Sequence, residues 1–170
     1  MMQIVVSDSS CLIDLRKASL LEAFVRLPYE LLIPNTLFDD ELIRFTPAQK
    51  RALVRGGLQV IDLPGDAVLR AADVARQLPR LSVSDGFAFS LAERNIGSIL
   101  LTGDGALRSF AASRGIDVRG VLWVIDELYI HQIVPAPILV DAIALFLADD
   151  TVRLPARELA AYLRRYQSRR

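Results

Sequence analysis

The stretch QIVVSDSSCLIDL, residues 3–15, decides the fold class. Residues 3–7 form a short apolar, β-branched run. The polar residues 8–10 follow, and a second apolar segment has helical spacing from about Cys11. A short apolar run that ends at polar turn residues is typical of a buried strand leading into a helix. The chain is therefore predicted to open with a strand–helix unit.

The same alternation continues toward the C-terminus. The pattern predicts further strands at 29–33, 58–63 (or an extended connection), 98–102 and 116–118. It predicts intervening helices on the segment carrying Leu37, Phe38 and Leu42 (capped by Asn35 or Thr36), at 66–77, from about Ser84, and at 106–113. Such alternation is typical of a parallel sheet with helices on both faces. The predicted fold class is α/β, a three-layer α/β/α Rossmann-like sandwich with a central parallel sheet.

Residues 120–170 are predicted to be mainly helical, with helices at 120–131, 137–148 and 155–166. They would form a C-terminal extension on a core of about residues 1–120. A chain of 170 residues fits one domain. We therefore expect a single domain over residues 1–170.

Composition excludes several classes of protein. Hydrophobic residues make up 52% of the chain and charged residues 24%, which excludes a disordered chain. Twenty basic residues balance twenty acidic ones, so net charge alone gives no argument for a nucleic-acid partner. The most apolar segment, 133–148, contains two prolines and an aspartate and is shorter than a membrane span. The single Cys11 and the lack of a signal-like N-terminus favour a reducing cytoplasm and no membrane.

Acidic residues fall where the predicted strands end. Asp8 directly follows strand 3–7, Asp104 closely follows strand 98–102, and Asp85 lies in the first turn of its helix. Glu41 is expected one turn into the helix after strand 29–33. Because ligands of open α/β sheets bind beyond the carboxyl ends of the strands, we expect these four side chains to face one crevice.

Each acid also has a purely structural explanation. Asp8 and Asp104 are possible helix caps, and Ser82 with Asp85 has the spacing of a capping box. Glu41 belongs to a run of three acids near a helix start, which is often solvated charge. These explanations do not account for the gathering of all four acids at one edge of the predicted sheet.

A cluster of carboxylates favours a divalent cation. Two unit charges about 4 Å apart repel by roughly 4 kcal/mol at an effective dielectric near 20, and a cation relieves that cost. An oxygen-only ligand set fits Mg²⁺ or Mn²⁺ better than zinc. Such a metal activates water against a phosphodiester. Ser10 and Thr102 stand beside two of the acids and either support the metal or serve as a cap and a strand end.

Basic side chains give weaker indications. Arg164, Arg165, Arg169 and Arg170 form a basic tail that either contacts RNA phosphate or is only solvated. Arg108 follows Asp104 by four residues and either lies near a phosphate or forms a salt bridge within the helix. His131 has no acid at catalytic spacing and is interpreted as a surface or cap residue.

The sequence resembles the PIN-domain family. The resemblance lies in IVVSDSSCLIDL (4–15), IPNTLFDDEL (33–42), LSVSDGFAFSLAERN (81–95) and LLTGDGALRSFA (100–111), in that order. The segment GVLWVIDELYIHQIVP (120–135), followed by a helix pair, resembles a bacterial and archaeal PIN subgroup of unassigned function. The resemblance implies that Asp8, Glu41, Asp85 and Asp104 are metal-site and catalytic acids, with Ser10 and Thr102 in support. Asp39 or Asp40 is an alternative to Glu41.

The resemblance also implies a function. PIN domains similar to VapC toxins cleave RNA, are held inactive by a cognate antitoxin and are often dimers. The sequence is therefore interpreted as an Mg²⁺- or Mn²⁺-dependent endoribonuclease, the toxin of a toxin–antitoxin pair and a homodimer. The alternative is a catalytically silent PIN module that binds RNA or a protein partner. A receiver or aspartyl-phosphate hydrolase is disfavoured, since no lysine follows the last acidic strand and Asp8 lacks a D-x-D pattern.

Overall fold

The computed structural model describes residues 1–169, in which short strands and helices alternate along the chain. The strands are β1 (Ile4–Ser7), β2 (Glu30–Pro34), β3 (Gln59–Ile61), β4 (Ile99–Leu101) and β5 (Asp117–Arg119). The helices are α1 (Ser9–Lys17), α2 (Leu21–Phe24), α3 (Asn35–Asp40), α4 (Pro47–Arg55), α5 (Gly65–Gln77), α6 (Val83–Arg94), α7 (Gly105–Ser113), α8 (Val121–Ile130), α9 (Ala136–Ala148) and α10 (Ala156–Gln167).

The strands form one sheet in the order β3-β2-β1-β4-β5, and all neighbouring pairs are parallel. The chain moves outward from β1 to β2 and β3, then returns to the other side of β1 to add β4 and β5. The point at which the strand order reverses lies between β1 and β4. In open α/β sheets this switch point is where ligands bind.

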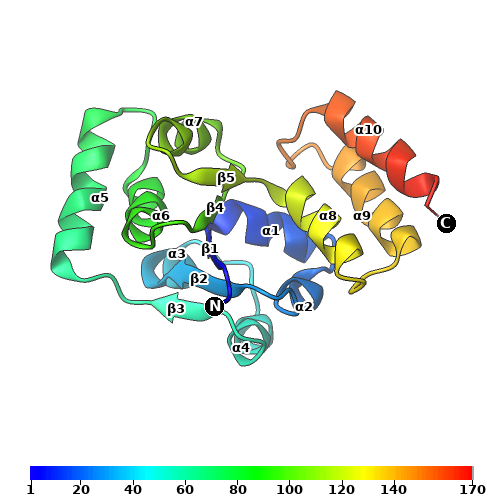
Figure 1. The fold of residues 1–170 in the computed structure, drawn as a ribbon, viewed down its shortest axis with the longest axis horizontal. Helices are drawn as coiled ribbons and strands as arrows, with labels where there is room; N and C mark the ends of the chain where they lie inside the picture. The colour runs from blue at the N-terminus through cyan, green and yellow to red at the C-terminus, as the bar shows by residue number, and fades with distance from the viewer. Residues whose placement is uncertain (170) are drawn as a thin grey trace.

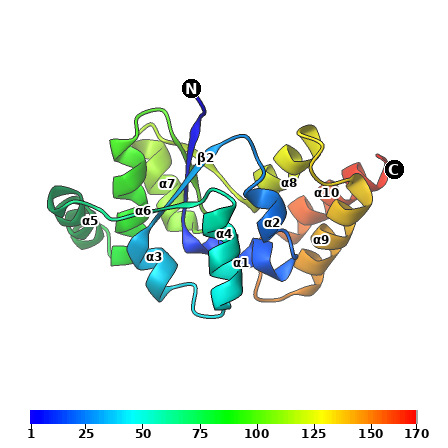
Figure 2. The same ribbon diagram turned by 90° about the horizontal axis from the view of Figure 1, so that it is seen from below.

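Helices cover both faces of the sheet, which confirms the predicted three-layer α/β/α class (Figure 1). Helices α3, α6 and α7 lie on one side, with α5 outside α6. Helices α1, α2 and α8 lie on the other side, with α9 and α10 beyond α8 (Figure 1). Figure 2 shows that α1 and α3 begin at the end of the sheet opposite the N-terminus. That end carries the carboxyl ends of the strands.

Burial on both faces explains why the central strands are apolar at consecutive positions. Val5, Val6, Leu100 and Leu101 are all fully buried. A strand with helices on each face has no solvated side and loses the usual alternation of apolar and polar residues. The short apolar runs therefore identified the centre of the sheet correctly.

Several predicted boundaries need correction. Helix α1 begins at Ser9, two residues before the predicted start, because Asp8 caps it. Helix α3 ends at Asp40, so Leu42 lies beyond the helix. Its N-cap is Pro34, which makes no side-chain hydrogen bond, and not Asn35 or Thr36 as predicted. The short α2 was not predicted. Neither was α4, although Thr46 and Gln49 form a capping box at its start.

The predicted helical extension is present as α8, α9 and α10. Asp126 of α8 links the first and last helices of this extension. It accepts hydrogen bonds from Tyr162, Tyr166 and Arg165 of α10, at 2.9, 2.5 and 2.9 Å. Hydrogen bonds to a charged acceptor are among the stronger ones in proteins. In residues 1–169, no helix combines the length and the apolar character that a membrane crossing requires.

The backbones of α5 and α6 approach closely at Gly86. A Cβ added there would lie 2.4 Å from the carbonyl oxygen of Ala71. Four residues further along α6, the Ser90 hydroxyl donates to the Ala67 carbonyl at 2.9 Å. Small residues on both helices permit this contact, and the contact fixes the helix that carries Asp85.

We predict that Gly86→Ala lowers the free energy of unfolding by about 2 kcal/mol, because the new methyl meets backbone that cannot move aside alone. Urea denaturation followed by circular dichroism measures the change. Gly65→Ala is the matched control, since a Cβ there meets nothing within 4 Å; its effect should stay within about 0.5 kcal/mol. Equal, small effects for the two substitutions would contradict the close approach.

Candidate active site

Asp8 lies at the switch point of the sheet. The pairing of β1 with β4 sets Ser7 opposite Leu101, and the Asp8 N–H donates to the Leu101 carbonyl at 2.9 Å. Asp8 is 5% exposed and Thr102 is fully buried. The Thr102 hydroxyl donates to Asp8 Oδ2, so the two strand ends are joined by their side chains as well as by their backbones.

Ser10 completes the surroundings of the Asp8 carboxylate. Asp8 Oδ1 accepts hydrogen bonds from both the backbone N–H and the hydroxyl of Ser10, each at 2.6 Å. The first of these makes Asp8 the N-cap of α1. The Ser10 hydroxyl in turn accepts from the Gly103 N–H at 2.9 Å. The loop after β4 is therefore held against the start of α1.

Asp104 caps the helix on the neighbouring strand. Its Oδ1 accepts from the Leu107 N–H at 2.8 Å, and its own N–H donates to the Thr102 hydroxyl at 3.1 Å. Thr102 thus contacts both Asp8 and Asp104. The first N–H groups of α7 have no acceptor within the helix, so an anion beside Asp104 would meet hydrogen-bond donors.

Asp85 reaches the same region from α6. It forms a reciprocal capping box with Ser82: Asp85 Oδ2 accepts from the Ser82 N–H at 2.9 Å, and the Ser82 hydroxyl accepts from the Asp85 N–H at 3.1 Å. Asp85 is electrostatically coupled to both Asp8 and Asp104. The three aspartates therefore share one region of negative potential.

Glu41 is placed differently from the prediction. It is the C-cap residue of α3 and does not lie in the first turns of a helix. Its Oε1 accepts from the Ser9 hydroxyl at 2.9 Å, which links it to the start of α1. Asp39 and Asp40 are exposed. Of the three adjacent acids, Glu41 is the one that contacts the helix capped by Asp8.

Burial perturbs the ionisation of the aspartates. Loss of solvent raises the pKa of Asp8 to about 6, despite the hydrogen bonds from Ser10 and Thr102, and the charge of Asp85 adds to the rise. Burial also raises the pKa of Asp85, with a further contribution from Asp104. The neighbouring Cys11 is fully buried, and burial raises the pKa of its thiol far above neutrality. Cys11 is therefore an inert core residue and not a nucleophile.

Comparison with known families agrees with this geometry. A family model described as PIN domain matches residues 4–168, nearly the whole chain. The chain belongs to the PIN-domain family. No curated protein matches it closely enough to count as a relative. PIN domains are generally nucleases, so the fold is nuclease-like.

The acids of this PIN domain do not form a ready-made ligand cluster. Within residues 1–169, no three His, Cys, Asp or Glu side chains are close enough together to hold a metal ion. The structural explanations are also correct for Asp8, Asp85 and Asp104, because Asp8 and Asp104 are N-caps and Asp85 completes the capping box of Ser82. Hydrogen bonds engage both Asp8 oxygens, Oδ1 in the cap and Oδ2 with the Thr102 hydroxyl, but capping engages only Oδ2 of Asp85 and Oδ1 of Asp104.

The donor chemistry nevertheless fits a hard divalent cation. Every candidate ligand in this PIN domain is a carboxylate or hydroxyl oxygen, which suits Mg²⁺ or Mn²⁺. Burial raises the pKa values of Asp8 and Asp85, and in residues 1–169 neither carboxyl forms a salt bridge. A bound cation would supply a compensating positive charge. The hydrogen bond between Ser9 and Glu41 was not predicted from the sequence. The only signal for Ser9 was its position next to Asp8 in the DSS motif.

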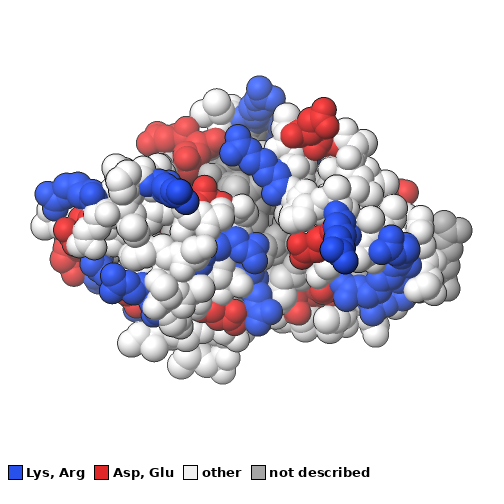
Figure 3. Space-filling model, turned by 90° about the horizontal axis from the view of Figure 1, so that it is seen from above, with Lys and Arg blue, Asp and Glu red and all other residues white. Residues whose placement is uncertain are grey.

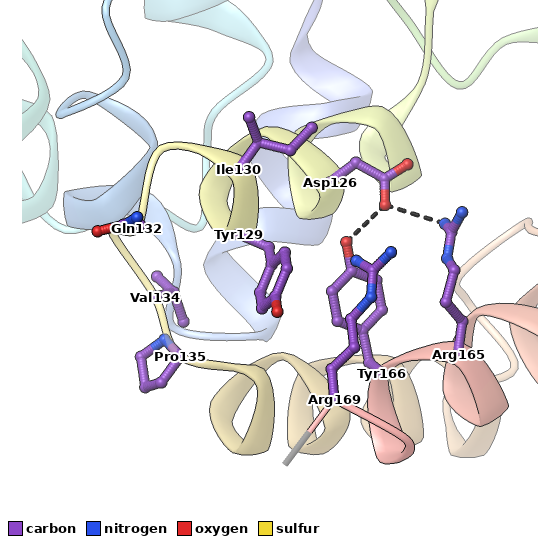
Figure 4. A pocket seen from close by; sticks show the side chains of 9 residues that line it. All are labelled: Asp126, Tyr129, Ile130, Gln132, Val134, Pro135, Arg165, Tyr166 and Arg169. Carbon is purple, nitrogen blue, oxygen red and sulfur yellow. Dashed lines mark hydrogen bonds and ion pairs between the residues drawn. The ribbon is translucent and has the colours of Figure 1, made fainter.

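A second cavity of the PIN domain lies away from these acids, between α8 and α10 (Figure 4). It measures about 590 Å³. Asp126 binds Arg165 and Tyr166 on its wall, and the Arg169 guanidinium lies over the Tyr129 and Tyr166 rings, 4.8 and 5.0 Å from their centres. This cavity therefore belongs to the packing of the extension.

The predicted basic residues are mostly engaged elsewhere. Arg165 and Arg169 belong to the cavity just described, Arg164 is exposed, and Arg170 lies outside the described residues. The Arg108 guanidinium packs against Gly120, where an added Cβ would lie 2.9 Å from its Nη1. His131 is the C-cap of α8, and its Nε2 lies 3.1 Å from Glu127 Oε2, a neighbour that sequence analysis overlooked.

We predict that Asp8→Asn makes stability less dependent on pH. A carboxyl whose pKa is raised by folding stabilises the protein below its unfolded pKa, and that stabilisation is lost as pH rises through the folded value of about 6. From pH 4 to pH 7 the unfolding free energy of Asp8→Asn should therefore gain about 2 to 3 kcal/mol relative to wild type. Urea denaturation with a chelator at both pH values measures this. A difference that stays constant with pH would contradict it.

Proposed function

We propose that this PIN domain is an Mg²⁺- or Mn²⁺-dependent endoribonuclease that hydrolyses RNA phosphodiester bonds at the carboxyl edge of its sheet. The observation that carries the proposal is that Asp8, Asp85 and Asp104 come from separate elements to the region of the switch point. The Asp8 carboxyl is buried, the charge of Asp85 acts on Asp8, and the charge of Asp104 acts on Asp85. Burial of the Asp8 carboxyl is costly, since it raises the pKa of that group to about 6. A buried carboxyl beside two other acids supports a function at this edge of the sheet.

The side chains have separable roles in this proposal. Asp8, Asp85, Asp104 and Glu41 would bind the divalent cation directly or through water. When bound, the cation would neutralise the acids and lower the pKa of a water molecule that attacks the phosphorus. Asp85 Oδ1 and Asp104 Oδ2 are not used in capping and can accept hydrogen bonds from that water.

The chain's own backbone supports the phosphate. The N-terminus of α7 directs N–H groups and the positive end of its dipole toward an anion beside Asp104. Ser10 and Thr102 hold the Asp8 carboxylate on both oxygens, so Asp8 cannot rotate away when the cation binds. Gly103 and Gly105 leave the surface beside Asp104 free of bulky side chains.

The proposal extends to partners. By its resemblance to VapC-like proteins, the chain would be the cytoplasmic toxin of a toxin–antitoxin pair, neutralised by a cognate antitoxin, and a homodimer. Helix α9 supports a protein partner, because Ile138 and Leu145, seven residues apart and therefore on one face, are 50 and 38% exposed on a helix with few charges. Exposed apolar helix faces mark contact surfaces.

A catalytically silent PIN module that binds RNA or a protein is the second candidate. Two observations favour it. In residues 1–169 the acids form no three-ligand cluster, and three of them already take part in helix capping, Asp8 and Asp104 as N-caps and Asp85 in a capping box. A silent module would fold and bind without metal-dependent cleavage. Cleavage therefore separates the two candidates.

We predict that the protein cleaves labelled single-stranded RNA with Mg²⁺ or Mn²⁺ and not with a chelator. Asp8→Asn and Asp104→Asn should each lower the rate about 100-fold or more, because each removes a charge from the proposed metal site. Asp141→Asn, on the exposed surface of α9, is the matched control and should keep the wild-type rate. Folded wild type that cleaves none of several RNAs under any metal would favour the silent module.

A further inference from the structure

A cavity of about 510 Å³ adjoins the acidic site and continues along α1. Ser10, Asp14 and Lys17 line it from one face of that helix, at positions i, i+4 and i+7. These positions span about 10 Å along the helix axis. Residues 103–105 form the end beside Asp104. The cavity is thus a continuation of the acidic site and not a separate pocket.

The far wall of the cavity comes from the connection between α9 and α10. Thr151 and Arg153 of this connection line the cavity. Lys17 Nζ donates to the Thr151 hydroxyl at 2.6 Å and lies 4.0 Å from Asp149 Oδ2. Asp149 Oδ1 accepts from both the N–H and the hydroxyl of Thr151. The connection is therefore fastened to the end of α1, which fixes the wall.

Acidic and basic side chains lie toward opposite ends of the cavity. Asp104 and Asp14 carry negative charge at the acidic end and in the middle. Lys17 and Arg153 carry positive charge toward the far wall, where Asp149 offsets part of the Lys17 charge. Within residues 1–169, Arg153 makes no ion pair, and its side chain is exposed. Lys17 has three donor hydrogens, of which the hydrogen bond to Thr151 uses one, while Asp149 lies 4.0 Å away as an ion-pair partner. The far end can therefore bind an anion.

We infer that this cavity is the channel for the RNA strand on one side of the cleaved bond, with Arg153 binding a backbone phosphate next to the cleaved one. The inference rests on the proposed function, which sets the cleaved phosphate beside Asp104. Lys17 assists by donating a further hydrogen bond. Such phosphate contacts position a strand without reading its sequence.

Charge and surface chemistry favour an RNA strand over an acidic peptide. The cavity opens directly onto the site where a phosphodiester must lie, and hydroxyls of Ser10 and Thr151 line its course. Acidic and basic side chains are interspersed on the molecular face in Figure 3, so that face offers no broad basic surface in the described residues. In this inference, single basic side chains such as Arg153 position the strand.

The test is binding of a fluorescein-labelled single-stranded RNA of about a dozen nucleotides, measured by anisotropy at several salt concentrations. Arg153→Gln is compared with Arg157→Gln, which removes an equal charge from an exposed residue outside the cavity. Both are made in the Asp8→Asn background with Mg²⁺ present, so that binding is read without cleavage. A DNA strand of the same sequence is the second probe.

We expect Arg153→Gln to weaken RNA binding about five- to tenfold at low salt and to reduce the salt slope by about 0.7, the share of one phosphate contact. Arg157→Gln should stay within about twofold of its parent. Equal effects of the two substitutions, an unchanged slope, or a parent that binds no RNA would each overturn the channel.

The same variants separate this inference from the nuclease itself. If wild type cleaves RNA and Arg153→Gln cleaves it equally well at limiting substrate, the nuclease stands and the channel is wrong. If RNA binding depends on Arg153 while wild type never cleaves, the channel stands and the protein is a binding module. Tighter binding of the DNA strand than of the RNA strand would overturn the assignment of RNA as occupant.

Discussion

The carboxylate of Asp8 is the feature on which the rest of the site depends. It is buried between the ends of β1 and β4 and is held by hydroxyls from the start of α1 and the end of β4. A buried carboxylate without a cation is costly, and its raised pKa of about 6 records that cost. The sheet supplies the position, because its strand order reverses there. The architecture thus creates a place where a divalent cation would be stabilising.

Much of the fold could be predicted because burial leaves a local signal. The apolar runs of the central strands and the polar residues after them located β1 and β4, and with them Asp8 and Asp104. The local sequence pattern does not predict elements whose formation depends on long-range contacts. The short α2 is held mainly by neighbouring helices, and α4 was missed although its Thr46–Gln49 capping box is visible in the sequence.

The sequence indicated which residues are candidates for the site better than it indicated how they are arranged. The prediction placed Glu41 inside a helix, whereas α3 ends one residue before it. A hydrogen bond from Ser9 orients the Glu41 side chain instead. No sequence pattern announces that contact, since the two residues are far apart in the chain. The same holds for the channel, in which Arg153 lines the same cavity as Asp104 because the α9–α10 connection lies against α1, where Lys17 contacts it. Tertiary contacts, and not local propensity, complete the site.

Binding of Mn²⁺ to the folded protein tests most directly whether the acidic edge is a metal site. The free-ion signal in electron paramagnetic resonance reports that binding independently of any substrate. Wild type and Asp141→Asn should bind Mn²⁺ alike, and Asp8→Asn and Asp85→Asn should bind it about tenfold more weakly or worse. Folded wild type that leaves Mn²⁺ free at millimolar protein, or equal binding by all four proteins, would contradict the assignment of the aspartates to a metal site.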